Sequence, residues 1–149
     1  MKKALTLVEV MIVVAILGIL AAIAIPQFRS HSQEAKEAAA KDNLRILRQQ
    51  IEVYAARHGG VAPGYFNDDP TQQAAFIIFV MQMFRSERYM SDLPRNPFND
   101  LKTIGFLGNA EEFPAEATGQ FGWIYKPFTK EIRLDWPGTD EKGIRYYDY

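Results

Sequence analysis

The sequence predicts an α+β fold in which one long N-terminal helix packs on a small antiparallel β-sheet. Three observations support this prediction. The first 25 or so residues are almost entirely apolar, the pattern then continues as an amphipathic helix, and the second half of the chain holds short segments that alternate apolar and polar residues. A length of 149 residues fits one small domain.

Composition excludes two broad classes of protein. Lys and Arg number 17 against 18 for Asp and Glu, so the net charge of −1 predicts no nucleic-acid partner. The sequence contains no cysteine, which excludes a disulfide framework and leaves the cellular compartment undetermined on that ground.

The N-terminal apolar segment is long enough to cross a membrane as a helix. Residues 10–25 contain no polar side chain, and about 20 apolar residues span a bilayer. Lys2 and Lys3 precede the segment, so the N-terminus is expected to stay in the cytoplasm and the remainder to be exported. A cleaved secretory signal peptide is the alternative, with residues 22–24 (Ala-Ile-Ala) as its cleavage site.

Two features favour a retained helix over a cleaved signal peptide. Glu9 lies inside the apolar segment, where a charged side chain costs up to about 3 kcal/mol and is usually functional. The helical pattern also continues beyond Pro26 to about His58, with apolar residues at 3- and 4-residue steps: Leu44, Leu47, Ile51 and Tyr54 or Ala55. Gly59 and Gly60 are expected to end this helix, and Pro26 to kink or loosen it.

The stretch ALTLVEVMIVVAILGILAAIAIPQF resembles the N-terminal signal of type IV pilins and of the pseudopilins of type II secretion. The resemblance implies that a prepilin peptidase removes residues 1–4 by cutting between Ala4 and Leu5, and that the new N-terminal Leu5 is N-methylated. Ala4 and Leu5 replace the commoner Gly and Phe at these positions. Pro26 matches the helix-loosening proline of the family.

In this family the glutamate at the position of Glu9 is thought to meet the amino terminus of a neighbouring subunit. The resemblance therefore implies that Glu9 sets the register of assembly, because two costly buried charges satisfy each other. In the alternative interpretation, the Glu9 side chain extends toward lipid headgroups at the membrane edge.

Residues 30–149 are expected to form the exported head, which includes the second half of the long helix. Asp69 as N-cap, Pro70 and Gln72 predict the start of a second helix, whose run from Phe76 to Met81 is predicted to be core. Residues 91–100 read as a loop. The segments FGWIY, EIRLD and IRYYD read as strands, with KPFT (126–129) turning the first into the second; residues 103–106 are a further short strand.

The sequence offers little chemistry for an enzyme. His31 and His58 are predicted to be solvated helix residues, and no catalytic grouping is evident, so neither an enzymatic activity nor a cofactor is expected. Acidic residues gather near the C-terminus (Asp135, Asp140, Glu141 and Asp148), a region where major pseudopilins often bind calcium. The calcium-loop pattern of that family is not recognisable here, so no metal site is assigned.

The expected function is that of a pseudopilin, a structural filament subunit of a type II secretion system. The resemblance implies residues 5–29 as transmembrane and filament-core helix, an inner-membrane location before assembly, and a periplasmic or cell-surface filament afterwards. Its expected partners are further copies, other pseudopilins, the prepilin peptidase, an inner-membrane assembly platform and membrane lipid. The alternatives are a type IV pilus subunit for adhesion, motility or DNA uptake, and a membrane-tethered enzyme or binding protein.

Processing is the first prediction. The basic leader and the acid four positions beyond Leu5 predict cleavage after Ala4, so mass analysis of the N-terminal peptide of the membrane form should find N-methyl-Leu5. A mature chain that begins at Ile25 would instead establish the signal-peptide alternative.

Overall fold

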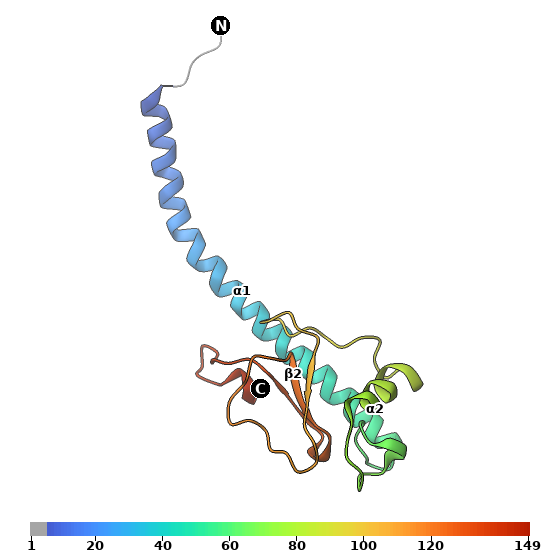
Figure 1. The fold of residues 1–149 in the computed structure, drawn as a ribbon. Helices are drawn as coiled ribbons and strands as arrows, with labels where there is room; N and C mark the ends of the chain where they lie inside the picture. Colours follow the sequence, from blue (N-terminus) through green and yellow to red (C-terminus); the bar gives the residue numbers. More distant parts are fainter. Residues whose placement is uncertain (1–5) are drawn as a thin grey trace. The chain divides into compact units, whose positions relative to one another are not determined.

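The computed structural model describes residues 6–149, apart from the side chains of residues 23–30. The chain forms two compact units, one up to Lys36 and one from Glu37 to Tyr149, which is the head. Helix α1 runs from Leu7 to Arg57 and belongs to both units (Figure 1). The other elements lie in the head: η1 (Phe66–Asp68), α2 (Phe76–Val80), the π-helical η2 (Met81–Ser86), β1 (Ile104–Phe106), β2 (Trp123–Lys126), η3 (Pro127–Thr129), β3 (Glu131–Leu134) and η4 (Tyr146–Asp148).

The second half of α1 forms one wall of the head's core. Every apolar residue predicted from the 3- and 4-residue spacing is at most 2% exposed, which confirms the predicted helix face. These residues are Leu44, Leu47, Ile51, Tyr54 and Ala55. Side chains from α2, η2 and the sheet pack against this face, namely Phe79, Met83, Trp123, Tyr125, Ile132 and Leu134. Burial of large apolar side chains on α1 therefore fixes where the sheet lies.

The two glycines that follow α1 end it as predicted. Gly59 and Gly60 have φ angles of +65° and +88°, which favour glycine. The Gly60 N–H donates to the carbonyl oxygen of Ala55 at 2.8 Å, which satisfies a carbonyl that the helix leaves open.

The sheet has the order β1-β2-β3 and is mixed, whereas the sequence predicted an antiparallel sheet. Strands β2 and β3 form the predicted antiparallel hairpin around η3, with Trp123 opposite Leu134 and Lys126 opposite Glu131. The short strand predicted at residues 103–106 is present as β1, but it pairs with β2 in parallel. The segment 107–122 crosses back to the start of β2 and makes this parallel pairing possible.

The predicted loop at residues 91–100 holds the start of β2 in place. Asn96 is fully buried, and its side-chain amide donates to the carbonyl oxygen of Gly122 at 3.1 Å. At position 122 only glycine fits, because a Cβ atom would lie 2.5 Å from the carbonyl oxygen of Leu101.

The second helix begins later than predicted. Asp69 does accept hydrogen bonds from the backbone and hydroxyl of Thr71 and from the side chain of Gln72, but these bonds form an isolated turn. The chain is then extended at Ala75, whose N–H donates to the carbonyl oxygen of Gly64, so α2 starts at Phe76. The prediction that the run 76–81 is core was half wrong: Phe79 is fully buried, but Ile77 and Met81 are 62% and 48% exposed.

The strand predicted at residues 144–148 is not formed, so this prediction was wrong as well. Tyr146 and Tyr147 are both buried, whereas successive residues of a strand point to opposite faces, and this segment folds as η4. Its anchors are three polar residues on the head part of α1. Glu37 accepts from the Tyr146 hydroxyl at 2.8 Å, Lys41 lies 4.1 Å from the centre of the Tyr149 ring, and Arg48 donates to the carbonyl oxygen of Tyr149.

Replacing Leu47 by Asp should abolish cooperative unfolding of a head fragment that starts near residue 30. Loss of a buried leucine side chain alone costs about 2–5 kcal/mol, and the substitution adds a buried carboxylate without a partner. A domain of this size has about 5–15 kcal/mol of stability in total. The measurement is thermal unfolding followed by circular dichroism.

The neighbouring Ile46→Asp is a matched control, because Ile46 is 38% exposed against 1% for Leu47. Ile46→Asp should retain a cooperative transition. A Leu47→Asp transition as cooperative as that of Ile46→Asp, at the same temperature, would show that this face of α1 does not pack in the core of the head.

Candidate functional site

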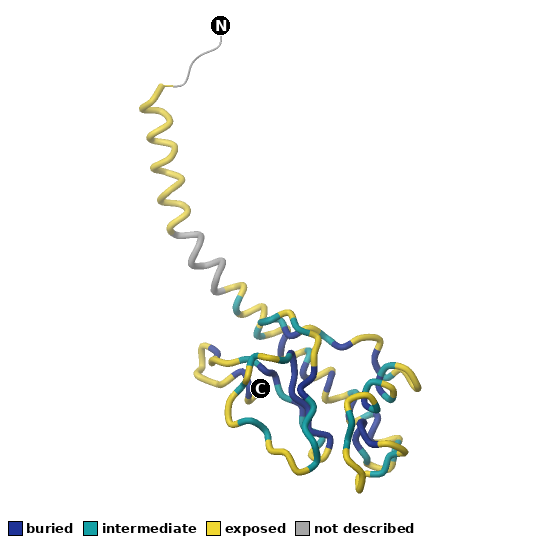
Figure 2. Tube along the Cα trace, viewed as in Figure 1, coloured by how far each residue is buried: buried dark blue, intermediate teal, exposed yellow. Residues whose placement is uncertain are grey.

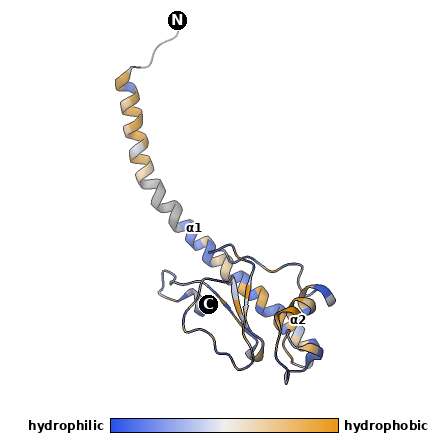
Figure 3. Cartoon of the chain, viewed as in Figure 1, coloured by the Kyte–Doolittle hydropathy of each residue, from blue (hydrophilic) through white to orange (hydrophobic). Residues whose placement is uncertain are grey.

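The first unit exposes apolar side chains on all sides of α1. From Leu7 to Leu20 the large apolar residues are 47–77% exposed, and the described residues 6–22 are exposed throughout (Figure 2). Figure 3 shows the same segment as almost uniformly hydrophobic. A helix that is apolar all round must be covered by lipid or by other protein, so this segment is the candidate site.

Glu9 and Thr6 form a reciprocal capping pair at the start of this helix. The Glu9 N–H donates to the Thr6 hydroxyl at 3.3 Å, and the Thr6 N–H donates to a Glu9 carboxylate oxygen at 3.5 Å. The Val10 N–H donates to the Thr6 carbonyl at 3.2 Å, which makes Thr6 the N-cap residue. Sequence reasoning missed this pair, although Thr-x-x-Glu before an apolar run is a recognised start signal.

Three predicted site residues lie outside what the structure describes. Ala4 and Leu5 precede the described range, and Pro26 falls among the residues whose side chains are not described. Helix α1 is continuous through residue 26, and the kink remains a prediction. In the part of the chain whose residues are fully described, no helix meets the length and apolarity needed to cross a bilayer. The predicted span 5–29 and its boundary with the head also remain predictions.

Three of the acidic residues near the C-terminus, Asp135, Asp140 and Asp148, hold loops in place. Asp135 is fully buried, and its carboxylate accepts from the N–H and hydroxyl of Thr118 at 2.6 and 2.7 Å. It also accepts from the N–H groups of Gly119 and Phe121 at 3.0 and 2.9 Å. Asp135 therefore fixes the end of the segment 107–122 where β2 begins.

Asp140 caps its own loop in the same way. Burial acts to raise the pKa of the Asp140 carboxyl, but hydrogen bonds from the Ile144 N–H, the Tyr149 hydroxyl and the Lys142 N–H hold that pKa below its ordinary value. Asp148 pairs with Arg145 at 2.6 Å. Over the residues that the structure describes, no three His, Cys, Asp or Glu side chains converge as metal ligands.

The two histidines differ. His31 is exposed, as predicted, 3.6 Å from a carboxylate oxygen of Glu34. The prediction for His58 was wrong, since its ring stacks on Tyr54 with centroids 3.9 Å apart and its Nδ1 lies 2.8 Å from an Asp68 carboxylate oxygen. Asp68 also accepts from the Tyr54 hydroxyl at 2.6 Å, a bond that adds to burial in raising the pKa of Tyr54. These groups satisfy one another and tie the end of α1 to η1.

Comparison with known proteins gives a match to the family described as "Prokaryotic N-terminal methylation motif", over residues 1–25. The chain is 56% identical over 46 residues to the type IV major pilin protein PilA of Myxococcus xanthus, a stretch that covers 31% of this chain and 21% of that protein. It is 43% identical over 49 residues to the type II secretion system core protein G of Pseudomonas aeruginosa, covering 33% and 34% of the two chains.

A third relative matches more of the chain. The fimbrial protein EcpB of Eikenella corrodens is 34% identical over 113 residues, which cover 75% of this chain and 64% of that protein. This chain thus spans between about a fifth and just under two thirds of the length of these relatives. No solved structure matches it.

Asp135→Asn should lower the free energy of unfolding of the head by about 2–3 kcal/mol. The amide keeps only one oxygen for four donors, and its NH₂ group would replace an oxygen that accepts hydrogen bonds from the Thr118 hydroxyl and the Phe121 N–H or from backbone N–H groups. Denaturant unfolding in excess calcium and in chelator measures the loss, with the exposed Glu141→Gln as control. A loss that appears only in calcium would instead mean that Asp135 is a metal ligand.

Proposed function

We propose that this chain, a member of the type IV pilin and pseudopilin family by its N-terminal methylation motif and its relatives, is a structural subunit of a type II secretion filament. The observation that carries the proposal is a single acid, Glu9, at the start of a helix segment whose apolar side chains are all exposed. Such a segment suits a subunit that waits in lipid and is then buried among other helices. The relatives are structural subunits, and this supports a role without enzymatic activity.

Assembly is driven, in this proposal, by exchange of one apolar environment for another. The subunit rests in the inner membrane with its N-terminus in the cytoplasm and loses residues 1–4 to the prepilin peptidase. An assembly platform then moves it into a helical filament, where helices of further copies replace lipid around α1. Filament extension pushes exported proteins outward.

Glu9 supplies the specificity of this exchange. Cleavage creates an amino group on Leu5, and that cation in apolar surroundings is costly unless it meets an anion. Among the residues that the structure describes, the Glu9 carboxylate accepts one hydrogen bond, from the Thr6 N–H at 3.5 Å, and a carboxylate has lone pairs for further donors. The amino group of a neighbouring copy fits this role, because a charge-assisted bond is about twice as strong as a neutral one.

A type IV pilus subunit is the second candidate. The match to the fimbrial protein EcpB, which extends over three quarters of this chain, favours it. The absence of cysteine favours secretion, since many pilus subunits close a C-terminal loop with a disulfide bond. The two candidates share the filament and differ in its output.

Glu9→Val and Glu9→Gln separate the two roles of the acid. Both remove the charge, but glutamine can still accept the Thr6 N–H and complete the cap, whereas valine cannot. If the carboxylate meets a neighbour's amino group, both variants should be cleaved after Ala4 and inserted normally, yet neither should form filaments. Processing is followed by mass, filaments by shearing, and output by the proteins in the culture supernatant.

A different result would reassign Glu9. Normal filaments from Glu9→Gln but not from Glu9→Val would mean that the acid acts only as a helix cap. Normal filaments from both variants would contradict any role for Glu9 in assembly, and α1 would then act by apolar packing alone.

A further inference from the structure

One face of α2 and η2 is apolar, exposed and flanked by positive charge. Ile77 and Met81 lie four residues apart, on the same side of the helix, and are 62% and 48% exposed. Arg85 and Arg88 follow and are exposed, and within residues 31–149 neither forms an ion pair. Glu87, the acid between these two arginines, instead contacts other residues. Its carboxylate accepts from the Tyr89 hydroxyl at 2.5 Å and lies 3.6 Å from His58. These four residues, Ile77, Met81, Arg85 and Arg88, form what we name the α2 face.

A second surface of the head is hollow and acidic, and it therefore complements the α2 face. Between the outer side of the sheet and the segment 107–122 lies an open hollow of about 460 Å³. Its lining includes the apolar residues Phe106, Phe121 and Ile124 and the acidic residues Glu111 and Glu112. The Glu112 side chain is 88% exposed, although its carboxylate lies 3.2 Å from the ammonium group of Lys126. We name this surface the acidic hollow.

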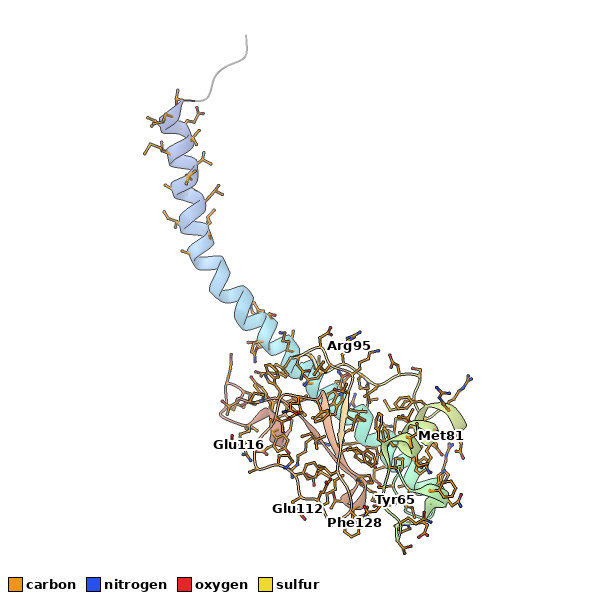
Figure 4. All side chains as sticks on the ribbon, viewed as in Figure 1. Tyr65, Met81, Arg95, Glu112, Glu116 and Phe128 are labelled. Carbon is orange, nitrogen blue, oxygen red and sulfur yellow. The ribbon has the colours of Figure 1, made fainter. Side chains whose placement is uncertain are left out.

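The Met81 end of the α2 face and the Glu112 side of the acidic hollow lie apart on the same head. Figure 4 shows Met81 at one side of the head and Glu112 toward the other. One molecule therefore cannot bring its own α2 face to its own acidic hollow. Two copies related by a screw operation can do so, and the contact then repeats from copy to copy without closing.

We propose that the α2 face of one copy docks into the acidic hollow of the next copy in the filament, with Ile77 and Met81 on its apolar lining and Arg85 and Arg88 beside Glu111 and Glu112. The proposal rests on the filament function proposed above and assigns the contact between heads. Charge complementarity disfavours the symmetric alternative, since two α2 faces would bring arginines together and two hollows would bring glutamates together.

Cysteine pairs test the contact cleanly, because the sequence contains no cysteine. Four strains would produce full-length Met81→Cys, full-length Glu111→Cys, both single variants together, or the double variant, and sheared filaments would be oxidised and run on a non-reducing gel. The double variant should give a ladder of dimers, trimers and longer species. Each single variant should stay monomeric, and filaments assembled from both single variants together should stop at dimers.

A second pair, Arg85→Cys with Glu111→Cys, guards against a local effect of the Met81 substitution. Wild-type filaments without a ladder from either pair would overturn the docking proposal and leave the filament function intact. Dimers from Met81→Cys alone would overturn it in favour of a symmetric contact. If the wild-type chain forms no filament, the proposed function fails first, and the docking proposal fails with it.

Discussion

The need to satisfy the Glu9 carboxylate in apolar surroundings limits which environments suit the first unit. Exposure of the apolar side chains from Leu7 to Leu20 to water is costly. Placing the Glu9 carboxylate in lipid is costly as well. The cap with Thr6 lowers the cost of Glu9 in a single copy, and among the described residues its carboxylate accepts one hydrogen bond, at 3.5 Å. In the proposed filament, the amino group of a neighbouring copy would supply a stronger partner.

The head differs from the first unit, because its large apolar side chains are buried against one another. One helix face anchors both the sheet and the last residues of the chain: leucines and Ile51 bury against the sheet, while Glu37, Lys41 and Arg48 hold the segment around Tyr146 and Tyr149. Buried carboxylates then fix loops that carry no regular structure. Asp135, for example, accepts four hydrogen bonds from three residues of the segment 107–122. These acids act as structural caps.

Local pattern predicted the parts of this fold that depend on local interactions. The spacing of Leu44, Leu47 and Ile51 predicted the buried face of α1, and KPFT predicted the β2–β3 hairpin. The parallel pairing of β1 could not be read in this way, because it depends on a crossover of residues 107–122 whose own sequence carries no strand or helix pattern. The roles of Asp69 and His58 were misread for a related reason. Asp69 forms a turn with Gln72 in place of a helix cap, and the His58 ring is held by Asp68, which lies beyond the helix. Of the candidate site, Glu9 was identified from its position in an apolar run, and its bond to Thr6 was not.

The most direct test of the central claim is the distance between the Glu9 carboxylate and the Leu5 nitrogen of a neighbouring copy, measured in a filament structure by electron cryomicroscopy. If the carboxylate meets the amino group, the separation should be about 2.7–2.9 Å, the length of a charge-assisted hydrogen bond. A filament in which Glu9 still faces its own Thr6, with the amino group of each neighbour elsewhere, would contradict it.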